Sequence, residues 1–520
     1  IQVGWRDAPR LWLVTRGAQS VLPGDQLEIS QAPLWGLGRT LALEHPELAC
    51  TLIDLDPHAP IAADSLTAEL ANGGPENQLA LRDGACLVAR LERCEAPPVA
   101  PGNTGPVVRG AGTYLITGGL GGLGLTVAEW LVAHGARHLA LLGRHAPSAS
   151  AGAILANLRS AGAEVMPIEA DVTQFDQLAD ALRCIEDQMP PLHGVVHAAG
   201  VLDDATMLSL SADRLSTVTA PKAAGAWNLH RLTLNCQLEW FVLFSSMASM
   251  LGSPGQANYA AANAFLDSLA HHRATLGLPA LSVNWGPWSA VGLAAAAANR
   301  GERLALRGIS SITPEQGIAG FGRLLGSKAT QVGVVAFDVR QWREFYPTTA
   351  QSPLLSVLVH EHGAARRVDT TNGSAMRTTL LMMDSNRRRQ ALQTYLIDIV
   401  ARVLRLASAR VDPRAPLTSL GLDSLMGLEI RNRLEADLGL RLPATLVWTY
   451  PTIAAVAVRL AELLEPPPSV ESQLESGNDG IDLTRLLEAG VADLSDAEAA
   501  SLLEAELASM SDVTEGRASG

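Results

Sequence analysis

The sequence feature that most constrains the fold is a glycine-rich stretch between a predicted strand and a predicted helix. Residues 113–117 predict a buried strand, and the apolar spacing of residues 125–134 predicts an amphipathic helix. Between them, Gly119, Gly121 and Gly124 form the pattern Gly-x-Gly-x-x-Gly. In this context the glycines allow a tight turn and let the backbone approach a pyrophosphate at the helix N-terminus. A dinucleotide-binding α/β unit is therefore predicted, with a glycine-rich turn that binds nothing as the alternative.

Further apolar runs extend this unit into a Rossmann-like sheet. Residues 138–142, 164–168 and 194–196 predict strands, and His197 at the end of the last one is interpreted as structural. Arg144 follows the second strand of the unit, where an acidic residue reads the ribose of NAD and an arginine accommodates the 2′-phosphate of NADP, so NADPH is predicted. The predicted cofactor-binding residues are Thr117, Gly118, Gly119, Gly121, Gly122, Leu123, Gly124, Arg144, Asp171, Val172, Ala198, Ala199 and Gly200.

A serine, a tyrosine and an asparagine after the next strand predict a carbonyl-reducing site. Residues 240–244 predict a strand that leads to Ser246, and Tyr259 and Asn263 follow on one face of a helix. A tyrosine can protonate a developing alkoxide, and a serine hydroxyl can polarise a carbonyl. A lysine ammonium lowers the pKa of a neighbouring phenol, and Lys222 is the candidate in this region, because the chain has only two lysines. Taken singly, each residue could equally be structural.

Composition excludes several classes of partner. The 520-residue chain has a net charge of −14, which argues against nucleic acid and against an anionic membrane surface. No apolar run approaches the roughly 18 residues that span a bilayer. The five cysteines lack metal-ligand spacing, so we expect reduced, mostly buried thiols, no metal site and a cytoplasmic location. Because the chain begins at Ile1 rather than Met, we expect it to be part of a longer polypeptide.

Residues 1–100 predict a structural half-domain that binds no cofactor. Strand and helix alternate there, but no glycine pattern follows the first strand. The predicted elements are strands at 11–15 and 51–55, a helix at 32–44 and a hairpin at 78–90 around Asp83 and Gly84. A Pro/Gly-rich linker at 97–106 separates this half from the catalytic region.

The C-terminal third predicts a small helical domain after a linker. Residues 346–385 lack sustained periodicity and predict a linker with one short helix. Apolar residues then recur at helical spacing over residues 388–406 and again up to residue 438. Asp423 fits an N-cap, which places Ser424 at a helix N-terminus, where the helix dipole would favour an attached phosphodiester.

Residues 1–345 as a whole resemble the ketoreductase of modular polyketide synthases, including its truncated structural half. The resemblance rests on Pro33-Leu-Trp-Gly-Leu-Gly-Arg, Thr117-Gly-Gly-Leu-Gly-Gly-Leu-Gly, His197-Ala-Ala-Gly-Val-Leu-Asp-Asp, Phe244-Ser-Ser and Gly252-Ser-Pro-Gly-Gln-Ala-Asn-Tyr. In that family lysine and asparagine exchange the places that they hold in ordinary short-chain reductases. The implied catalytic residues are Tyr259, Ser246, Lys222 and Asn263.

The resemblance also implies a stereochemical class. Leu202, Asp203 and Asp204 match the motif of the B-type group, and Leu251 is not the tryptophan that marks the A-type. The implied product is therefore the D β-hydroxyl. The loop that starts at Asn284 would be the lid over the substrate.

Residues 386–465 resemble an acyl carrier protein, and Ser424 matches the serine that carries 4′-phosphopantetheine. This resemblance implies a phosphopantetheinyl transferase as a partner. The acidic residues 478–520 resemble C-terminal docking segments that recruit the next synthase polypeptide. A frayed terminal helix is the alternative reading of this tail.

Together these features predict an α/β Rossmann-like short-chain dehydrogenase/reductase fold in two halves, followed by an all-α four-helix carrier domain and a helical tail. The predicted function is NADPH-dependent, B-type reduction of a β-ketoacyl thioester held on the carrier, within a module that also has upstream synthase domains. The alternatives are an inactive scaffold and reduction in fatty-acid synthesis. The expected segments are 1–100, 111–345, 346–385, 386–465 and 478–520.

Overall fold

The computed structural model describes most of the chain up to residue 464. The described residues are 9–58, 63–94, 108–292, 300–346, 352–363, 371–404, 406–422, 424–440, 442–443 and 446–464. The predicted linker at 97–106, the docking tail at 478–520 and Asp423 lie outside them. No helix in the described part of the chain is both long and apolar enough to cross a membrane.

The first sheet has four strands in the order β1-β2-β3-β4. β1 to β3 pair in parallel, and β3 and β4 form the predicted hairpin, whose turn residues Asp83 and Gly84 have φ of 49° and 76°. Two helices make the crossovers between the parallel strands. The elements are β1 (Trp12–Arg16), α1 (Pro33–Glu44), β2 (Thr51–Leu55), α2 (Ala63–Asn72), β3 (Gln78–Arg82) and β4 (Ala85–Val88).

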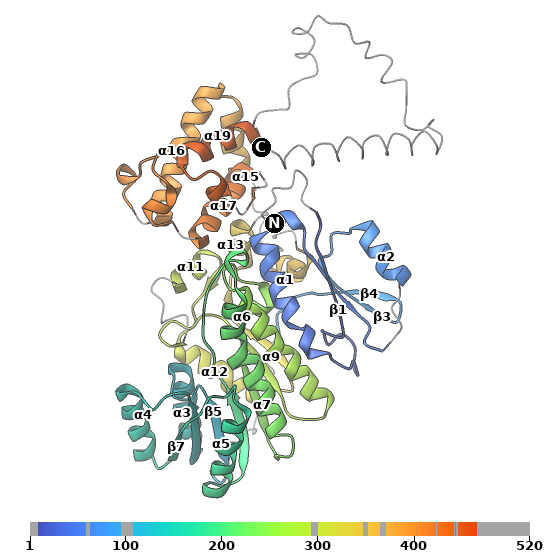
Figure 1. Ribbon diagram of the computed structural model, residues 1–520, viewed down its shortest axis with the longest axis vertical. Helices are drawn as coiled ribbons and strands as arrows, with labels where there is room; N and C mark the ends of the chain where they lie inside the picture. Colours follow the sequence, from blue (N-terminus) through green and yellow to red (C-terminus); the bar gives the residue numbers. More distant parts are fainter. Residues whose placement is uncertain are drawn as a thin grey trace, which may run out of the picture. The chain divides into compact units, whose positions relative to one another are not determined.

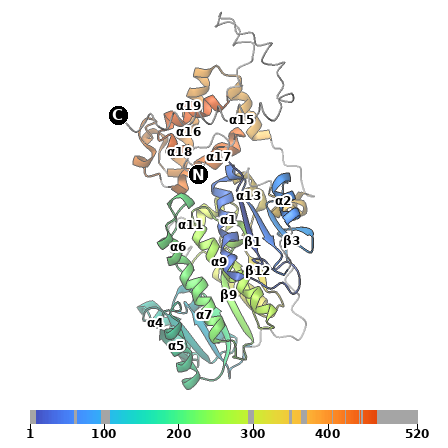
Figure 2. The same ribbon diagram turned by 45° about the vertical axis from the view of Figure 1, so that its right-hand side comes forward.

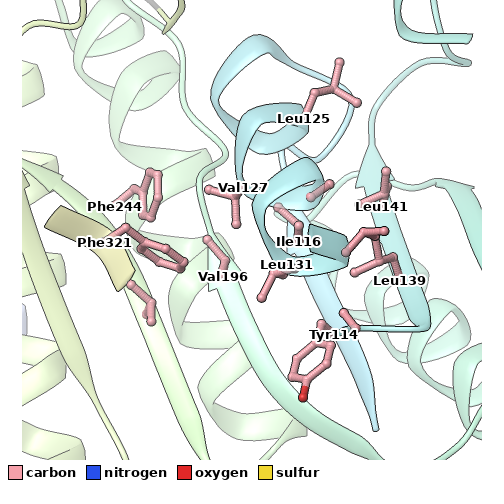
Figure 3. Packing of buried hydrophobic residues seen from close by; sticks show 14 of the residues in the cluster. Tyr114, Ile116, Leu125, Val127, Leu131, Leu139, Leu141, Val196, Phe244 and Phe321 are labelled. Atoms are coloured by element: carbon pink, nitrogen blue, oxygen red, sulfur yellow. The ribbon is translucent and has the colours of Figure 1, made fainter. Parts of the chain in front are cut away.

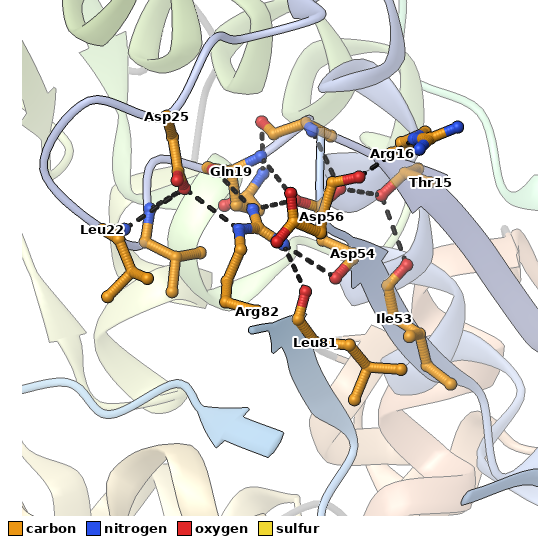
Figure 4. Close-up of polar contacts among 12 residues, drawn as sticks. Thr15, Arg16, Gln19, Leu22, Asp25, Ile53, Asp54, Asp56, Leu81 and Arg82 are labelled. Carbon is orange, nitrogen blue, oxygen red and sulfur yellow. Dashed lines mark hydrogen bonds and ion pairs between the residues drawn. The ribbon is translucent and has the colours of Figure 1, made fainter. Parts of the chain in front are cut away.

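A buried charge network fills the carboxyl end of this sheet (Figure 4). Asp54 accepts hydrogen bonds from the amides of Ala18 and Gln19, at 2.8 and 3.2 Å, and pairs with Arg82 at 2.6 Å. Arg82 also contacts Asp25 at 3.1 Å. Burial lowers the pKa of Arg82, but the bonds to Asp54 and Asp25 outweigh it, so the pKa lies above its ordinary value. The amides of the loop after β1 are therefore bound by a carboxylate of the chain itself, Asp54.

The expectation of mostly buried cysteines is wrong. Of the five, only Cys50 is buried, whereas Cys86 and Cys94 are exposed. Cys86 lies in β4, the edge strand of the first sheet, whose residues are mostly exposed. Burial raises the pKa of the Cys50 thiol to about 12.

The second sheet has seven parallel strands in the order β12-β10-β9-β8-β5-β6-β7. The strand order reverses between β5 and β8, and ligands of such sheets bind outside the carboxyl ends of the strands at this point. The predicted strands of the catalytic region are confirmed to within two residues at each end. The elements are β5 (Thr113–Thr117), β6 (His138–Gly143), β7 (Glu164–Glu169), β8 (Leu192–His197), β9 (Trp240–Ser246), β10 (Leu281–Trp285) and β12 (Gln331–Val334).

Helices cover both faces of this sheet (Figures 1 and 2). Val127 and Leu131 of α3 pack with Phe321 of α12 against one face (Figure 3), and Leu229 and Leu266 pack against the other. Both clusters consist of apolar side chains withdrawn from water, which is the main favourable contribution to folding. The covering helices are α3 (Gly122–Ala133), α4 (Ala149–Ser160) and α12 (Pro314–Leu325) on the first face, and α5 (Phe175–Gln188), α7 (Gly225–Leu232) and α9 (Ala257–Thr275) on the second.

The two halves meet where α1 crosses α9. A Cβ added at Gly36 of α1 would lie 2.2 Å from the carbonyl oxygen of Ala260 in α9, so only glycine allows this close approach. The first half therefore buttresses the helix that contains Tyr259. Shorter elements complete this part: α6 (Ala212–Thr219), η4 (Ala220–Ala224), α8 (Met247–Leu251), α11 (Arg300–Leu306), β11 (Ile309–Ser310), β13 (Ala336–Phe337) and α13 (Val339–Phe345).

The C-terminal described residues are helical, as predicted, with one helix more than expected before the carrier domain. Leu355 and Leu358 are buried in one apolar cluster with Trp342 and Tyr346, so the start of the predicted linker has packing that periodicity alone does not reveal. Ser424 is the first residue of α17, as expected. The helices are α14 (Ser356–Gly363), α15 (Thr371–Leu381), α16 (Ser385–Leu404), α17 (Ser424–Leu438), α18 (Leu446–Thr449) and α19 (Ile453–Leu464).

Candidate active site

A cavity of about 870 Å³ lies at the carboxyl ends of the central strands of the second sheet. It joins the glycine-rich loop at one end to Ser246 and Tyr259 at the other. The predicted site residues that line it are Gly118, Gly121, Gly122, Leu123, Gly124, Arg144, Asp171, Val172, Ala198, Ala199, Gly200, Leu202, Lys222, Ser246 and Tyr259.

The glycine-rich loop is shaped to approach a ligand closely. Gly118 has φ of 67°, and a Cβ there would lie 2.9 Å from the carbonyl group of Ala198. A Cβ at Gly124 would lie 2.4 Å from the oxygen of Gly118, so this glycine lets α3 start directly against the loop. The first amides of a helix have no partner within it, and those of α3 begin at Gly122, beside the cavity. This geometry fits a pyrophosphate.

Thr117 does not present its side chain to the cavity. Its buried hydroxyl lies 2.7 Å from Nδ1 of His197. Burial, and next the charge of Lys222, lower the pKa of His197 to about 3, so this imidazole is neutral at physiological pH. The pair joins the ends of β5 and β8 behind the loop, consistent with the structural role expected for His197.

Ser246, Tyr259 and Lys222 come from three elements and face one space. Ser246 ends β9, Tyr259 lies in the first turn of α9, and Lys222 lies in η4, a π-helical turn. The Lys222 Nζ is 5.4 Å from the centre of the Tyr259 ring and donates to the carbonyl oxygen of Phe244 at 2.8 Å. Burial lowers the pKa of Lys222 to about 8, and the charge of Asp267 opposes this shift. The arrangement can polarise a carbonyl and protonate its oxygen.

Asn263 lies behind this group rather than in the cavity lining. It is one turn after Tyr259 on α9, is fully buried, and donates from Nδ2 to the Tyr259 carbonyl oxygen at 2.7 Å. Its Oδ1 has no hydrogen-bond partner among the described residues. The carbonyl of Asn263 accepts from the Ser245 hydroxyl at 3.2 Å, which ties α9 to the strand that ends in Ser246.

The predicted stereocontrol motif forms a loop attached to the start of α9. Leu202 lines the cavity. The Asp203 carbonyl accepts from Asn258 Nδ2 at 2.8 Å, and Asp204 Oδ1 accepts from Gln256 Nε2 at 3.1 Å. Asp203 and Asp204 therefore hold the loop in place, while Leu202 contacts the cavity.

Comparisons with known proteins identify the parts of the chain. A KR domain model matches residues 112–290, the Rossmann fold domain of polyketide synthase extender module SpnB matches residues 4–91, and the phosphopantetheine attachment site matches residues 394–460. An A1-type ketoreductase structure is 38% identical with a TM-score of 0.64, over 69% of this chain and 75% of that one. The chain belongs to the modular polyketide synthase family. It contains a ketoreductase followed by a carrier domain.

Relatives from two bacterial genera match long stretches of this chain. One polypeptide of the phenolphthiocerol/phthiocerol polyketide synthase of Mycobacterium tuberculosis is 41% identical over 375 residues, which is 72% of this chain and 16% of the relative. Polyketide synthase GfsB of Streptomyces halstedii is 40% identical over 466 residues, 86% of this chain and 8% of that protein. The chain thus spans a sixth or less of the length of these relatives. The ketoreductase domain implies NADPH as cofactor, and the attachment site implies 4′-phosphopantetheine.

Two features of this ketoreductase site follow from packing rather than from motifs. Trp285 and Trp288 line the cavity, at the start of the loop interpreted as a lid, of which residues 293–299 lie outside the described part. Asp267, which sequence reasoning missed, accepts from the hydroxyls of Ser249 and Ser282, both at 2.6 Å. Its spacing of two turns after Tyr259 on α9 is the signal that could have found it.

Proposed function

We propose that this chain reduces a β-ketoacyl thioester, held on its own carrier domain, to the D-β-hydroxyacyl thioester with NADPH. The observation that supports this most directly is that the glycine-rich loop and the group Ser246, Tyr259 and Lys222 line one cavity. A cofactor held by the loop and a carbonyl held by the group would meet in that space. Reduction of β-ketoacyl thioesters is the activity of ketoreductase domains, so the proposal concerns which residues of this chain perform it.

Each side chain has a distinct role in the proposed reaction. Bound NADPH would supply the hydride that reaches the carbonyl carbon. Ser246 would donate a hydrogen bond to the carbonyl oxygen, and Tyr259 would transfer its proton to that oxygen as negative charge develops there. The ammonium of Lys222 would stabilise the resulting phenolate. One hydride and one proton are thus added across the carbonyl, which gives a hydroxyl.

We infer that Arg144 gives the preference for NADPH. Its side chain lines the cavity just after β6, where the 2′-phosphate of the adenosine ribose would lie. Asp171 and Val172 line the cavity at the end of β7 and would contact the adenine.

Replacing Arg144 by alanine removes a charge-assisted contact to the phosphate. We expect KM for NADPH to rise about tenfold or more while KM for NADH stays unchanged, because such a contact is worth about 1.5–3 kcal/mol. Steady-state kinetics with both cofactors measures this. An equal loss with NADPH and NADH would contradict the assignment of Arg144.

The carrier and stereochemical assignments are parts of the same proposal. Ser424 would receive 4′-phosphopantetheine from a phosphopantetheinyl transferase, and the arm would carry the acyl chain to the cavity. Leu202, Asp203 and Asp204 would favour the D-hydroxyl. Upstream synthase domains would supply the substrate, and residues 478–520 would recruit the next polypeptide.

Tyr259→Phe tests the reductase directly. We expect kcat with a β-ketoacyl thioester to fall by about 10²–10⁴, since the proton donor is lost, while NADPH affinity is unchanged. Tyr346→Phe is the matched control, because that tyrosine is also buried but is not among the residues that line the cavity. Full activity of Tyr259→Phe would refute the role of Tyr259. Wild-type protein that binds NADPH but never oxidises it would instead indicate an inactive scaffold.

A further inference from the structure

The C-terminal part of α1 binds the segment that joins β9 to α9. Gly252, Ser253 and Gln256 of this segment line the cavity. Three hydrogen bonds make the contact: Arg39 Nη1 with the carbonyl of Ser249 at 2.6 Å, the Thr40 hydroxyl with the amide of Ser253 at 3.2 Å, and Glu44 Oε1 with the amide of Gly255 at 2.7 Å. Helix α1 thus supports, from behind, a segment that forms one wall of the cavity.

Glu44 differs from Arg39 and Thr40 because it also holds the loop that follows Leu202, Asp203 and Asp204. Its second oxygen, Oε2, accepts from the amide of Met207 at 2.7 Å, so both carboxylate oxygens are used. The residue is 1% exposed. Burial raises its pKa, and the two amide bonds oppose that shift. A carboxylate removed from water is retained here by two backbone amides from distant parts of the chain.

The two segments held by Glu44 also contact each other. The amide of Ala205 donates to the Gly255 carbonyl at 2.8 Å, and Gln256 Nε2 donates to Asp204 at 3.1 Å. One segment continues from the stereocontrol motif, and the other leads into the helix of Tyr259. Leu202 of the first segment and Gln256 of the second both line the cavity.

We propose that Glu44 is a positioning residue that sets the stereochemical outcome of reduction, by fixing the 202–207 loop against the 252–256 segment. This inference rests on the proposed ketoreductase function. The substrate enters between these two segments, so their spacing determines which face of the carbonyl turns toward the hydride. Without Glu44 the segments keep their mutual bonds but lose their common anchor, and both substrate orientations become accessible.

Glu44→Gln tests this with little change in shape. An amide nitrogen has no lone pair for an amide N–H, so one of the two bonds is lost. The substrate is an unsubstituted β-ketoacyl N-acetylcysteamine thioester. We expect the ratio of D to L alcohol to fall about tenfold, because a tenfold change corresponds to about the free energy of one hydrogen bond to a charged group. Glu47→Gln is the matched control: it makes the same change three residues away, where the carboxylate contacts His45, and should leave the ratio unchanged.

A second variant, with its own control, removes one of the two Glu44 bonds from the loop side, in case Glu44→Gln does not fold. Met207→Pro deletes the donating amide, at the first position of a short helical turn where proline is tolerated. Thr206 before it is extended, with ψ of 159°, as a residue preceding proline should be. Met207→Ala keeps the amide and loses only the side chain. Only Met207→Pro should lower the ratio.

The outcomes separate this inference from the function on which it rests. A lower D to L ratio in Glu44→Gln and Met207→Pro, with most turnover retained, supports the positioning role. An unchanged ratio in both folded variants overturns it and leaves Glu44 as a stability residue, which melting curves would show. Wild-type protein that makes the L alcohol overturns the B-type assignment, but the change of ratio on losing Glu44 still decides the inference. Absence of turnover in wild type overturns both.

Discussion

The loops after β1 and β5 hold equivalent places in the two sheets, but their backbone amides face different partners. Each follows the first strand of a parallel β-α-β unit and begins with a glycine of nearly the same φ, 66° at Gly17 and 67° at Gly118. In the first sheet Asp54 binds the amides of the loop, and in the second the loop lines a cavity. Loop amides of this kind favour an anion. One half supplies it as a side chain, and we propose that the other takes it from the cofactor.

Removal of the internal anion should have the largest effect on stability. In Asp54→Asn, Arg82 loses the negative charge of its 2.6 Å partner while it stays buried. We expect the free energy of unfolding to fall by roughly 3–5 kcal/mol, as when one member of a buried ion pair is removed. Denaturant titration followed by circular dichroism measures this, and NADPH affinity should be unchanged under conditions where the variant is folded.

Asp56→Asn is the matched control for Asp54→Asn. Asp56 is two residues further on and accepts from the amide of His58 at 2.8 Å on the protein surface. A change there should stay within about 0.5 kcal/mol. Equal effects of the two substitutions on the free energy of unfolding would show that the buried network does not stabilise the loop after β1.

Alanine substitutions at Gly17 and Gly118 should affect NADPH binding differently in the two loops. Both positions have left-handed φ, so either substitution introduces backbone strain of about 1–2 kcal/mol. Gly118→Ala should also weaken NADPH binding about tenfold, because its Cβ would push against Ala198 at the edge of the cavity. Gly17→Ala should lower only the melting temperature. If Gly17→Ala weakens NADPH binding as much as Gly118→Ala, the functional distinction between the loops is wrong.

The buried cations of the two halves predict different responses to pH. Arg82 has its pKa raised by two carboxylates, whereas the pKa of Lys222 is lowered by burial to about 8. The ammonium of Lys222 is present below that pKa and lost as pH rises through it. We therefore expect kcat/KM to be halved near pH 8 and to fall about tenfold per unit above it, while the far-ultraviolet circular dichroism stays constant.

Asp267→Asn sharpens this pH prediction. The charge of Asp267 raises the pKa of Lys222, so its removal should move the alkaline limb of the profile to lower pH. A profile that is flat from pH 7 to pH 10 in the wild type would contradict the role of the Lys222 ammonium.

Local sequence patterns were sufficient to predict the features of this protein that depend on residues close together in the chain. Strand runs, the glycine spacing and the helical spacing of Tyr259 and Asn263 concern residues within one or two elements. Because parallel strands bring their carboxyl ends to one edge of a sheet, these patterns also predict that Arg144, Ser246 and Tyr259 share a site. The structure places all three on one cavity.

The remaining features depend on contacts between residues far apart in the sequence. Glu44 binds amides 163 and 211 positions away, and no periodicity encodes such a contact. Asp54 lies near the end of a second strand, where a ribose-binding acid usually lies. Its carboxylate instead accepts from the amide of Ala18 in the loop after β1. Thr117 belongs to the glycine motif, yet its side chain binds His197 behind it. The sequence identifies these residues, but their roles follow only from packing.

The most direct test follows one acyl group on the intact chain. Ser424 is loaded with a β-ketoacyl phosphopantetheine from the corresponding coenzyme A thioester by a phosphopantetheinyl transferase, and NADPH is added. Mass spectrometry of the carrier-bound acyl group, with chiral analysis after release, gives the product. The proposed function predicts the D-β-hydroxyacyl group in the wild type and an unreduced acyl group in Tyr259→Phe. A wild-type chain that binds NADPH and is loaded at Ser424 but leaves the β-ketone intact would contradict it.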